Sequence, residues 1–319
     1  MEPTKMNRQL DPDAQALLDV IAAMGSAPPY TLPVDVARER MRAAFVTKDE
    51  PLALERVEDV SVPTPAGALP CRIYRPGEGA LPLAMFFHGG GWTLNDIDTH
   101  DALCRRIAKR SGWLLASLDY RRAPEHKYPA ALEDAYFGYR WLFDNAERIG
   151  ADVSYRALVG ESSGGTMAAS LTLLLREMNG PMPTYQVMAY PMTDMYDRWP
   201  SYQERGTGYA LDRDFMHWYV DNYLPSSWDL QDPYLFPVTS IDLTDLPPTL
   251  IMTAEFDPLR DEGVAYAEKL ASAGVAVEHV HAEDQMHGFL MMDRAVRRAG
   301  ELIDELARAL AAHGPQGPV

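Results

Sequence analysis

Apolar positions in the first part of the chain follow a helical period and then an alternating one. Between residues 13 and 45 they recur at roughly helical spacing, with the turn-rich stretch 25–30 between two such segments. This pattern predicts two helices. Farther on, short alternating runs at 57–62 and 69–74 are separated by prolines and a glycine, which predicts a β-hairpin.

From residue 81 onward, mostly apolar runs alternate with segments of helical period. Such runs favour strands that are buried on both faces, and the segments between them have the length of crossover helices. We therefore predict an α/β fold in which helices flank a mostly parallel central sheet. The predicted strands are 81–87, 113–118, 157–159, 185–190, 249–253 and 275–281, and the predicted helices are 99–111, 130–149, 165–178, 262–273 and 294–312.

One stretch, residues 193–225, breaks this alternation and is rich in aromatic side chains. The spacing of Phe215, Trp218, Tyr219 and Tyr223 predicts a short helix within it. Two interpretations are open: the insertion forms a lid over an active site, or it is an aromatic patch that merely packs on the core.

Charge and cysteine content narrow the classes of partner. The chain has 319 residues with 46 acidic and 29 basic side chains, a formal net charge of -17. This charge disfavours nucleic acid and anionic membranes as partners. Two cysteines are too few for a disulfide framework, residues 1–16 lack the apolar core of a signal peptide, and no apolar run is long enough to span a membrane. We therefore expect a cytoplasmic protein.

The segment Leu158 to Gly165 has the context of a nucleophile elbow, because it follows an apolar run and precedes a helical one. At such a sharp turn, glycines two positions on either side of the nucleophile avoid Cβ clashes. Gly160 and Gly164 occupy those positions around Ser162. We predict that Ser162 is a nucleophile, although a glycine-rich turn that only caps a helix would give a similar pattern.

A second glycine motif, His88-Gly89-Gly90-Gly91-Trp92, directly follows a predicted strand. Backbone without side chains can place N–H groups close to the oxyanion of a tetrahedral intermediate. We assign this role to Gly90 and Gly91, with the N–H of Ser163 as the third donor. Gly89 shapes the turn or donates in place of Gly91, and the sequence does not separate these options. A flexible glycine turn is the alternative.

A serine nucleophile needs a base and an orienting carboxylate, and both are expected on loops after later strands. His287, beside a glycine in the loop after the last predicted strand, is our candidate base. Asp257 is preferred as the acid over Glu255 and Asp261. The pair His279 and His281 invites a metal interpretation, but no further ligand lies at a zinc-like spacing, so no metal is expected.

Taken together, five ordered motifs resemble the hormone-sensitive lipase family of bacterial esterases. They are His88 to Trp92, Tyr120 to His126, Gly160 to Gly165, Asp257 to Asp261, and His287 to Phe289. The resemblance implies an α/β-hydrolase fold, short-chain acyl esters as substrates and no cofactor. It also implies a helical cap formed by residues 1–50 and 193–225, with residues 51–192 and 226–319 as the catalytic core.

The chain departs from the family pattern on both sides of the nucleophile, where the family often has Asp and Ala and this chain has Glu161 and Ser163. Neither change touches the predicted triad. Ser163 is expected to act through its backbone N–H, so its hydroxymethyl group is compatible with the oxyanion role. Arg122 also replaces a commonly apolar residue.

These inferences predict a serine carboxylesterase that acts on small-molecule esters. Two alternatives are an amidase or deacetylase with the same triad, and a small-molecule receptor, against which the presence of His287 argues. Five side chains are expected near a small substrate pocket because they adjoin the catalytic loops or the insertion: Trp92, Tyr209, Trp218, Met286 and Phe289. The oligomeric state stays open, with a homodimer as the commonest arrangement.

Overall fold

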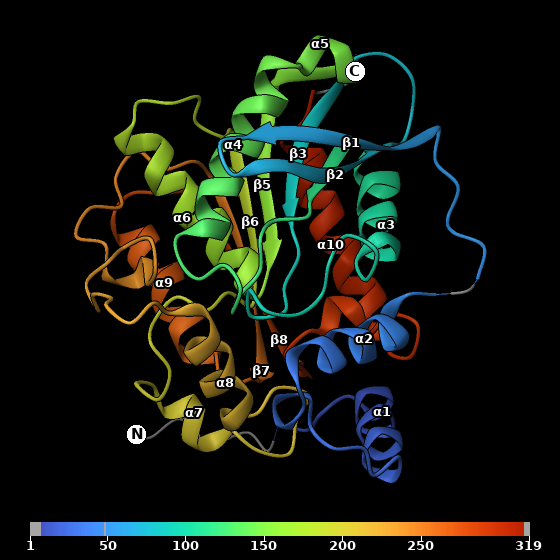
Figure 1. The fold of residues 1–319 in the computed structure, drawn as a ribbon, viewed down its shortest axis with the longest axis vertical. Coiled ribbons are helices and arrows are strands. Elements are labelled where there is room, and N and C mark those ends of the chain that lie inside the picture. The colour runs from blue at the N-terminus through green and yellow to red at the C-terminus, as the bar shows by residue number, and fades with distance from the viewer. Residues whose placement is uncertain (1–7, 48, 316–319) are drawn as a thin grey trace.

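A computed structural model describes residues 8–47 and 49–315 and has one eight-stranded sheet (Figure 1). The strand order is β1-β2-β4-β3-β5-β6-β7-β8; β1 pairs with β2 and β2 with β4 antiparallel, and all other pairs are parallel. The strands are β1 (Arg56–Thr64), β2 (Gly67–Arg75), β3 (Leu81–Phe87), β4 (Leu114–Leu118), β5 (Ala151–Glu161), β6 (Tyr185–Ala189), β7 (Thr249–Phe256) and β8 (Val277–Met286).

Helices cover both faces of this sheet, which confirms the predicted α/β fold. One face packs against α4 (Ala130–Asp144), α6 (Ser163–Glu177) and α9 (Arg260–Ser272), and the other against α3 (Asp101–Ser111) and α10 (Arg297–Ala312). The short helix α5 (Ala146–Ile149) follows α4. Three 3-10 turns also occur among the described residues: Pro29–Thr31, Pro237–Thr239 and Phe289–Met291.

The central strands are apolar throughout because successive side chains point into different layers. In β3, Met85 and Phe87 join the cluster on the α6 side, whereas Ala84 and Phe86 join the cluster on the α10 side. Burial of both faces therefore explains why these strands read as continuous apolar runs.

Two strands at one side of the sheet extend beyond their predicted ends. β7 continues to Phe256 instead of ending at Thr253, and β8 continues to Met286 instead of ending at His281. The added part of β8 carries Glu283 and Asp284, and β8 is an edge strand with partly exposed side chains. The apolar pattern of such a strand stops before the strand itself ends, because polar side chains can occupy its exposed side.

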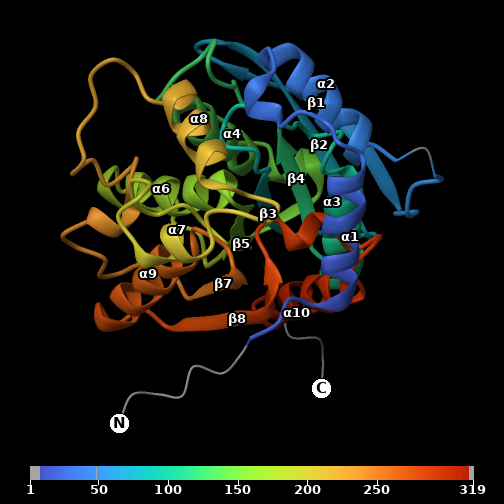
Figure 2. The same ribbon diagram turned by 90° about the horizontal axis from the view of Figure 1, so that it is seen from below.

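The N-terminal segment and the insertion after β6 lie together at one end of the sheet (Figures 1 and 2). The first supplies α1 (Pro12–Ala23) and α2 (Val34–Phe45), and the second supplies α7 (Pro200–Glu204) and α8 (Arg213–Tyr223). The two segments are in contact, since the rings of Tyr30 and Phe215 lie 5.4 Å apart and Tyr30 donates to Asp212 over 3.3 Å. The helices predicted in both segments are confirmed.

The division into cap and core stays a prediction. Residues 1–7 and 48 of the predicted cap, and residues 316–319 of the predicted core, lie outside the described residues. Across residues 8–47 and 49–315, no helix combines the length and the apolar composition that crossing a membrane requires.

Candidate active site

Ser162 occupies a sharp turn between β5 and α6. Its backbone has φ 54° and ψ -126°, a conformation that costs energy for a residue with a side chain. A Cβ atom on Gly160 would lie 2.1 Å from the carbonyl oxygen of Gly164, and one on Gly164 would lie 2.0 Å from the carbonyl oxygen of Phe87. The turn is therefore compatible only with glycine at both positions, as an elbow requires.

His287 and Asp257 lie in line with this serine. The Ser162 Oγ is 2.9 Å from Nε2 of His287, and Nδ1 of His287 is 2.8 Å from Oδ2 of Asp257. Asp257 is fully buried, and its Oδ1 accepts a bond of 2.8 Å from the N–H of Leu259. With the ring proton on Nδ1, the imidazole can take the serine proton on Nε2 while the carboxylate stabilises the resulting cation.

The other carboxylates considered from the sequence have different partners. Oε1 of Glu255 accepts from Arg205 over 2.8 Å and from Arg260 over 3.0 Å. Asp261 accepts from the N–H of Ser201 over 2.8 Å and from Arg260 over 2.7 Å. Of the three candidates, the structure thus places only Asp257 beside His287.

The His279 and His281 pair contacts a hydroxyl group. Both rings lie within 2.9 Å of Thr253 Oγ1, and His281 also lies 3.2 Å from Glu255. No group of three or more metal-binding side chains occurs in the described part of the chain. These histidines are accounted for by their hydrogen bonds with neighbouring side chains.

Glu255, on the strand that leads to Asp257, binds Arg205 of the insertion. Burial alone raises the pKa of Glu255, but the hydrogen bond from Arg205 and the charge of Arg260 outweigh it and lower this pKa to about 2, below the ordinary value of 4.5. The ionised carboxylate therefore contributes stability above pH 4.5, and this contribution is lost as the pH falls toward 2.

Glu255→Gln should accordingly lower the free energy of unfolding at pH 7 by about 2 to 4 kcal/mol, because it leaves arginines without their buried partner. The difference in unfolding free energy between wild type and variant should be about 1 kcal/mol smaller at pH 4 than at pH 7. Urea unfolding at both pH values measures it. An equal difference at pH 7 and pH 4 would contradict the assigned role of the carboxylate.

The loop after β3 brings the second glycine motif to Ser162. Gly91 and Ser163 line the same hollow as Ser162. The structure gives the N–H groups of Gly89, Gly90, Gly91 and Ser163 no acceptor among residues 8–47 and 49–315, so they are available to a ligand. Which of the glycines donates to an oxyanion stays a prediction.

His88, the first residue of this motif, is fully buried and contacts main-chain atoms rather than the triad. Its Nδ1 lies 2.9 Å from the carbonyl oxygen of Gly89, and its ring stacks on Tyr120 with centroids 4.2 Å apart. Burial and the nearby ring of His100 lower the pKa of His88 well below its ordinary value. The neutral ring supports the loop.

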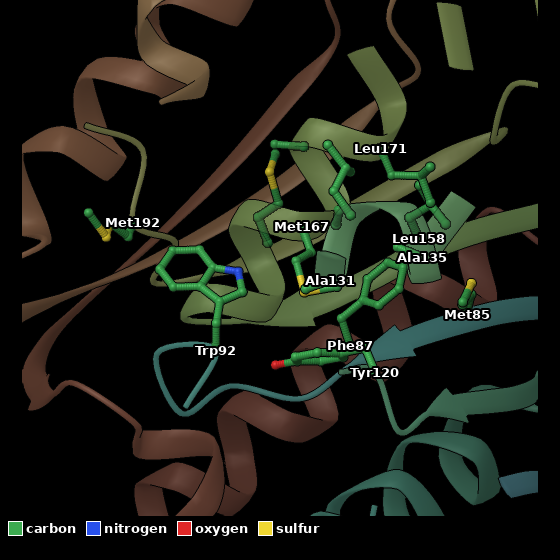
Figure 3. Packing of buried hydrophobic residues seen from close by; sticks show 14 of the residues in the cluster. Met85, Phe87, Trp92, Tyr120, Ala131, Ala135, Leu158, Met167, Leu171 and Met192 are labelled. Carbon is green, nitrogen blue, oxygen red and sulfur yellow. The ribbon is translucent and has the colours of Figure 1, made fainter. Parts of the chain in front are cut away.

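The hollow beside Ser162 is mostly apolar and takes residues from both the core and the insertion. Its lining consists of Gly91, Trp92, Ser162, Ser163, Met192, Leu211, Met216, Tyr219 and Leu259. The insertion thus reaches the nucleophile, which favours the lid interpretation over an aromatic patch that merely packs on the core. Helix α8 also packs on the glycine loop, because the rings of Tyr223 and Trp92 stack 4.1 Å apart (loop shown in Figure 3).

Among the five predicted pocket residues, only Trp92 lines this hollow. Met286 is fully buried and packs in a cluster with Phe256, and Tyr209 packs against that same cluster. Phe289 is fully buried against Tyr190, whose ring centroid lies 4.8 Å from that of His287. The ring of Trp218 on α8 contacts Phe215 and Tyr219. Proximity in sequence to a catalytic loop therefore did not predict which side chains line the hollow.

Five lining residues were missed: Met192, Leu211, Met216, Tyr219 and Leu259. Leu259 had a signal, since it belongs to the same motif as Asp257, and Tyr219 belonged to the aromatic helix predicted in the insertion. Met192, Leu211 and Met216 had none, because their position depends on how the insertion folds over the core.

Known proteins agree with this fold. Residues 84–291 match a family model described as the alpha/beta hydrolase fold. The chain belongs to the α/β-hydrolase fold family. The elbow at Ser162 and the eight-stranded sheet are thus features of an α/β-hydrolase, and the fold that the motifs implied is confirmed.

Relatives of this α/β-hydrolase span nearly its whole length. A carboxylic ester hydrolase, LipN, of Mycobacterium tuberculosis is 40% identical over 95% of this chain and 83% of its own. The carboxylesterase NlhH of the same species is 37% identical over 98% and 99%. An ethyl acetate hydrolase of Pseudomonas putida is 36% identical over 95% and 99%. These names bear out the resemblance to esterases.

Two solved structures are also similar to this chain. An ester hydrolase from the metagenome of Lake Arreo, complexed with a bipyridine phosphonate derivative, has a TM-score of 0.92 and 36% identity over 96% of this chain and 99% of its own. A thermostable esterase from Pseudomonas putida has a TM-score of 0.93 and 31% identity over 98% of this chain and 100% of its own.

Proposed function

We propose that this α/β-hydrolase is a serine carboxylesterase of the hormone-sensitive lipase family that hydrolyses short-chain acyl esters. The observation that carries the proposal is the line of contacts from Ser162 through His287 to Asp257, at 2.9 and 2.8 Å. Three relatives with similar sequences are named as ester hydrolases, which supports the same reaction.

In the proposed reaction, Ser162 Oγ attacks the ester carbonyl carbon and its proton passes to Nε2 of His287. The N–H groups of Gly90, Gly91 and Ser163 receive the oxyanion. Collapse of the tetrahedral intermediate breaks the bond to the alcohol, which takes the proton from His287 and leaves an acyl-enzyme. Water then repeats both steps and releases the acid, while Asp257 keeps the imidazole proton on Nδ1.

The proposed substrates are small because the insertion limits the space beside Ser162. In this account residues 1–50 and 193–225 form a cap on the core, and Leu211, Met216 and Tyr219 enclose the reacting group. Cys71 and Cys104 are both buried free thiols, which supports the proposed cytoplasmic location.

A series of p-nitrophenyl esters from acetate to palmitate tests the substrate class. We expect the highest kcat/KM for short acyl groups and a steep decline beyond about ten carbons, because a longer chain cannot fit the capped hollow. An optimum at palmitate would contradict this assignment.

Matched p-nitrophenyl ester and p-nitroanilide substrates of the best acyl length test the leaving group. The ester should react faster, because p-nitrophenolate leaves the tetrahedral intermediate more readily than p-nitroaniline. A faster anilide would make the protein an amidase with the same triad. If neither compound reacts, the receptor interpretation gains support.

A further inference from the structure

The glycine loop at residues 88–92 is held at both ends by side-chain hydroxyl groups. At its start, Tyr120 Oη donates to the carbonyl oxygen of His88 over 2.7 Å. At its end, the N–H of Trp92 donates to Oγ of Ser163 over 3.3 Å. Ser163 is 1% exposed, so water competes little for this bond. The bond also occupies the N–H that follows the glycines, which leaves the glycine N–H groups as the free donors of the loop.

The residue before the nucleophile contacts the same loop. Oε1 of Glu161 lies 3.0 Å from Nε2 of His100, in a site where Glu161 is 4% exposed and His100 fully buried. A Cβ atom on Gly89 would lie 2.0 Å from that same oxygen, so the carboxyl group rests directly against the Gly89 main chain. Thr99 Oγ1 lies 3.0 Å from the other ring nitrogen of His100 and fixes the ring in turn.

Three consecutive glycines have many accessible conformations, whereas oxyanion stabilisation needs donors held within a few tenths of an ångström. Glu161 and Ser163 are covalently adjacent to Ser162, so a contact from either side chain to the loop fixes the donors relative to the nucleophile itself. Contacts from elsewhere in the fold, such as that of Tyr120, fix the loop only relative to the core.

We propose that Glu161 and Ser163 are positioning residues that hold the Gly89–Trp92 loop in register with Ser162, so that its N–H groups converge on the oxyanion. The proposal rests on the proposed esterase function and adds a role for both side chains. These are the two positions where the chain departs from the Asp and Ala frequent in the family it resembles. Asp and Ala are therefore variants that the fold tolerates.

Ser163→Ala removes the acceptor of the Trp92 N–H and keeps the backbone N–H of residue 163. We expect kcat for the best ester to fall about five- to tenfold with KM within twofold of wild type, because the loss concerns oxyanion alignment rather than substrate binding. Ser170→Ala is the matched control, since Ser170 is a buried serine of the same helix whose Oγ lies 2.8 Å from the main-chain oxygens of both Thr166 and Tyr234. Its kcat should stay within twofold of wild type.

Glu161→Asp withdraws the carboxyl group by one methylene, so it cannot reach both His100 and Gly89. We expect kcat to fall about tenfold, again with little change in KM. Glu161→Gln keeps the length and an oxygen acceptor, so it should lose less than Glu161→Asp. A larger loss of kcat in Glu161→Asp than in Glu161→Gln would show that the reach of the side chain matters more than its charge. With two variants, the proposal can still be tested if one of them folds poorly.

Inhibition constants provide a second measurement, because a smaller fraction of folded enzyme lowers the apparent kcat but does not change Ki. Ser162 Oγ adds to the carbonyl carbon of an alkyl trifluoromethyl ketone and forms an oxyanion at the donors, whereas the matched trifluoromethyl carbinol has no carbonyl group and binds without forming one. Ki for the trifluoromethyl ketone should rise in both Ser163→Ala and Glu161→Asp by the same factor as kcat/KM falls. Ki for the carbinol should not change.

Two results would overturn the proposal: kcat and trifluoromethyl ketone Ki within twofold of wild type in both variants, or equal weakening of both inhibitors. The wild-type ester rate is measured first, so failure of the proposed function is seen separately. An inactive wild-type enzyme refutes the esterase and the positioning role together, whereas an active wild type with unaffected variants refutes only the positioning role.

Discussion

Replacing Ser162 with alanine should lower kcat for the best p-nitrophenyl ester by about 10⁵- to 10⁶-fold. The reason is that Oγ is the only atom of this side chain in contact with Nε2 of His287, so its removal eliminates acyl-enzyme formation. Alanine retains the Cβ atom, and the unfolding free energy should change by less than about 1 kcal/mol. Steady-state rates and thermal melts of both proteins measure these effects.

Binding provides the control for this variant. Because the lining of the hollow is otherwise unchanged, a non-hydrolysable ether analogue of the ester should bind wild type and Ser162→Ala with Kd values within about threefold. A variant that binds the analogue and keeps more than about 1% of wild-type kcat would show that Ser162 is not the nucleophile.

Asp257→Asn should reduce kcat by about 10⁴-fold, the second largest effect. Oδ2 of Asp257 accepts from Nδ1 of His287, and Oδ1 accepts from the N–H of Leu259. An asparagine that keeps the Leu259 bond presents its NH₂ group to Nδ1, which forces the ring proton onto Nε2. His287 then cannot accept the proton of Ser162.

Asp261→Asn is the matched control, because it makes the same chemical change nearby, in the first turn of α9, without contact to His287. Asp261 accepts from Ser201 and Arg260, so its substitution should reduce stability and leave kcat within about tenfold of wild type. If Asp261→Asn proved more damaging to kcat than Asp257→Asn, the choice of acid made from the sequence would be wrong.

Features set by local chain geometry could be predicted from the sequence. The elbow follows from Gly160, Ser162 and Gly164 between an apolar run and a helical one, because few residue types fit such a turn. The position of His287 followed from the order of strands, since loops after parallel strands meet at one edge of the sheet. The same reasoning placed the acid among three neighbouring carboxylates, of which Asp257 was preferred.

The lining of the hollow could not be predicted, because it depends on how the insertion packs against the core. Tyr219 lies so close to the glycine loop that a Cβ atom on Gly91 would be 2.1 Å from its ring, a contact between residues far apart in sequence. Tyr209 and Met286 instead join a cluster with Phe256. Aromatic composition identified the insertion but gave no information on which side chains face Ser162.

Covalent labelling with an alkyl fluorophosphonate, read by peptide mass spectrometry, tests the central claim most directly. The reagent needs a serine activated by its base, so we expect stoichiometric phosphonylation of Ser162, blocked by a good ester substrate and absent in Ser162→Ala. A wild-type protein that stays unlabelled, or that carries the label on a different serine, would contradict the assignment of Ser162 as the nucleophile of an ester hydrolase.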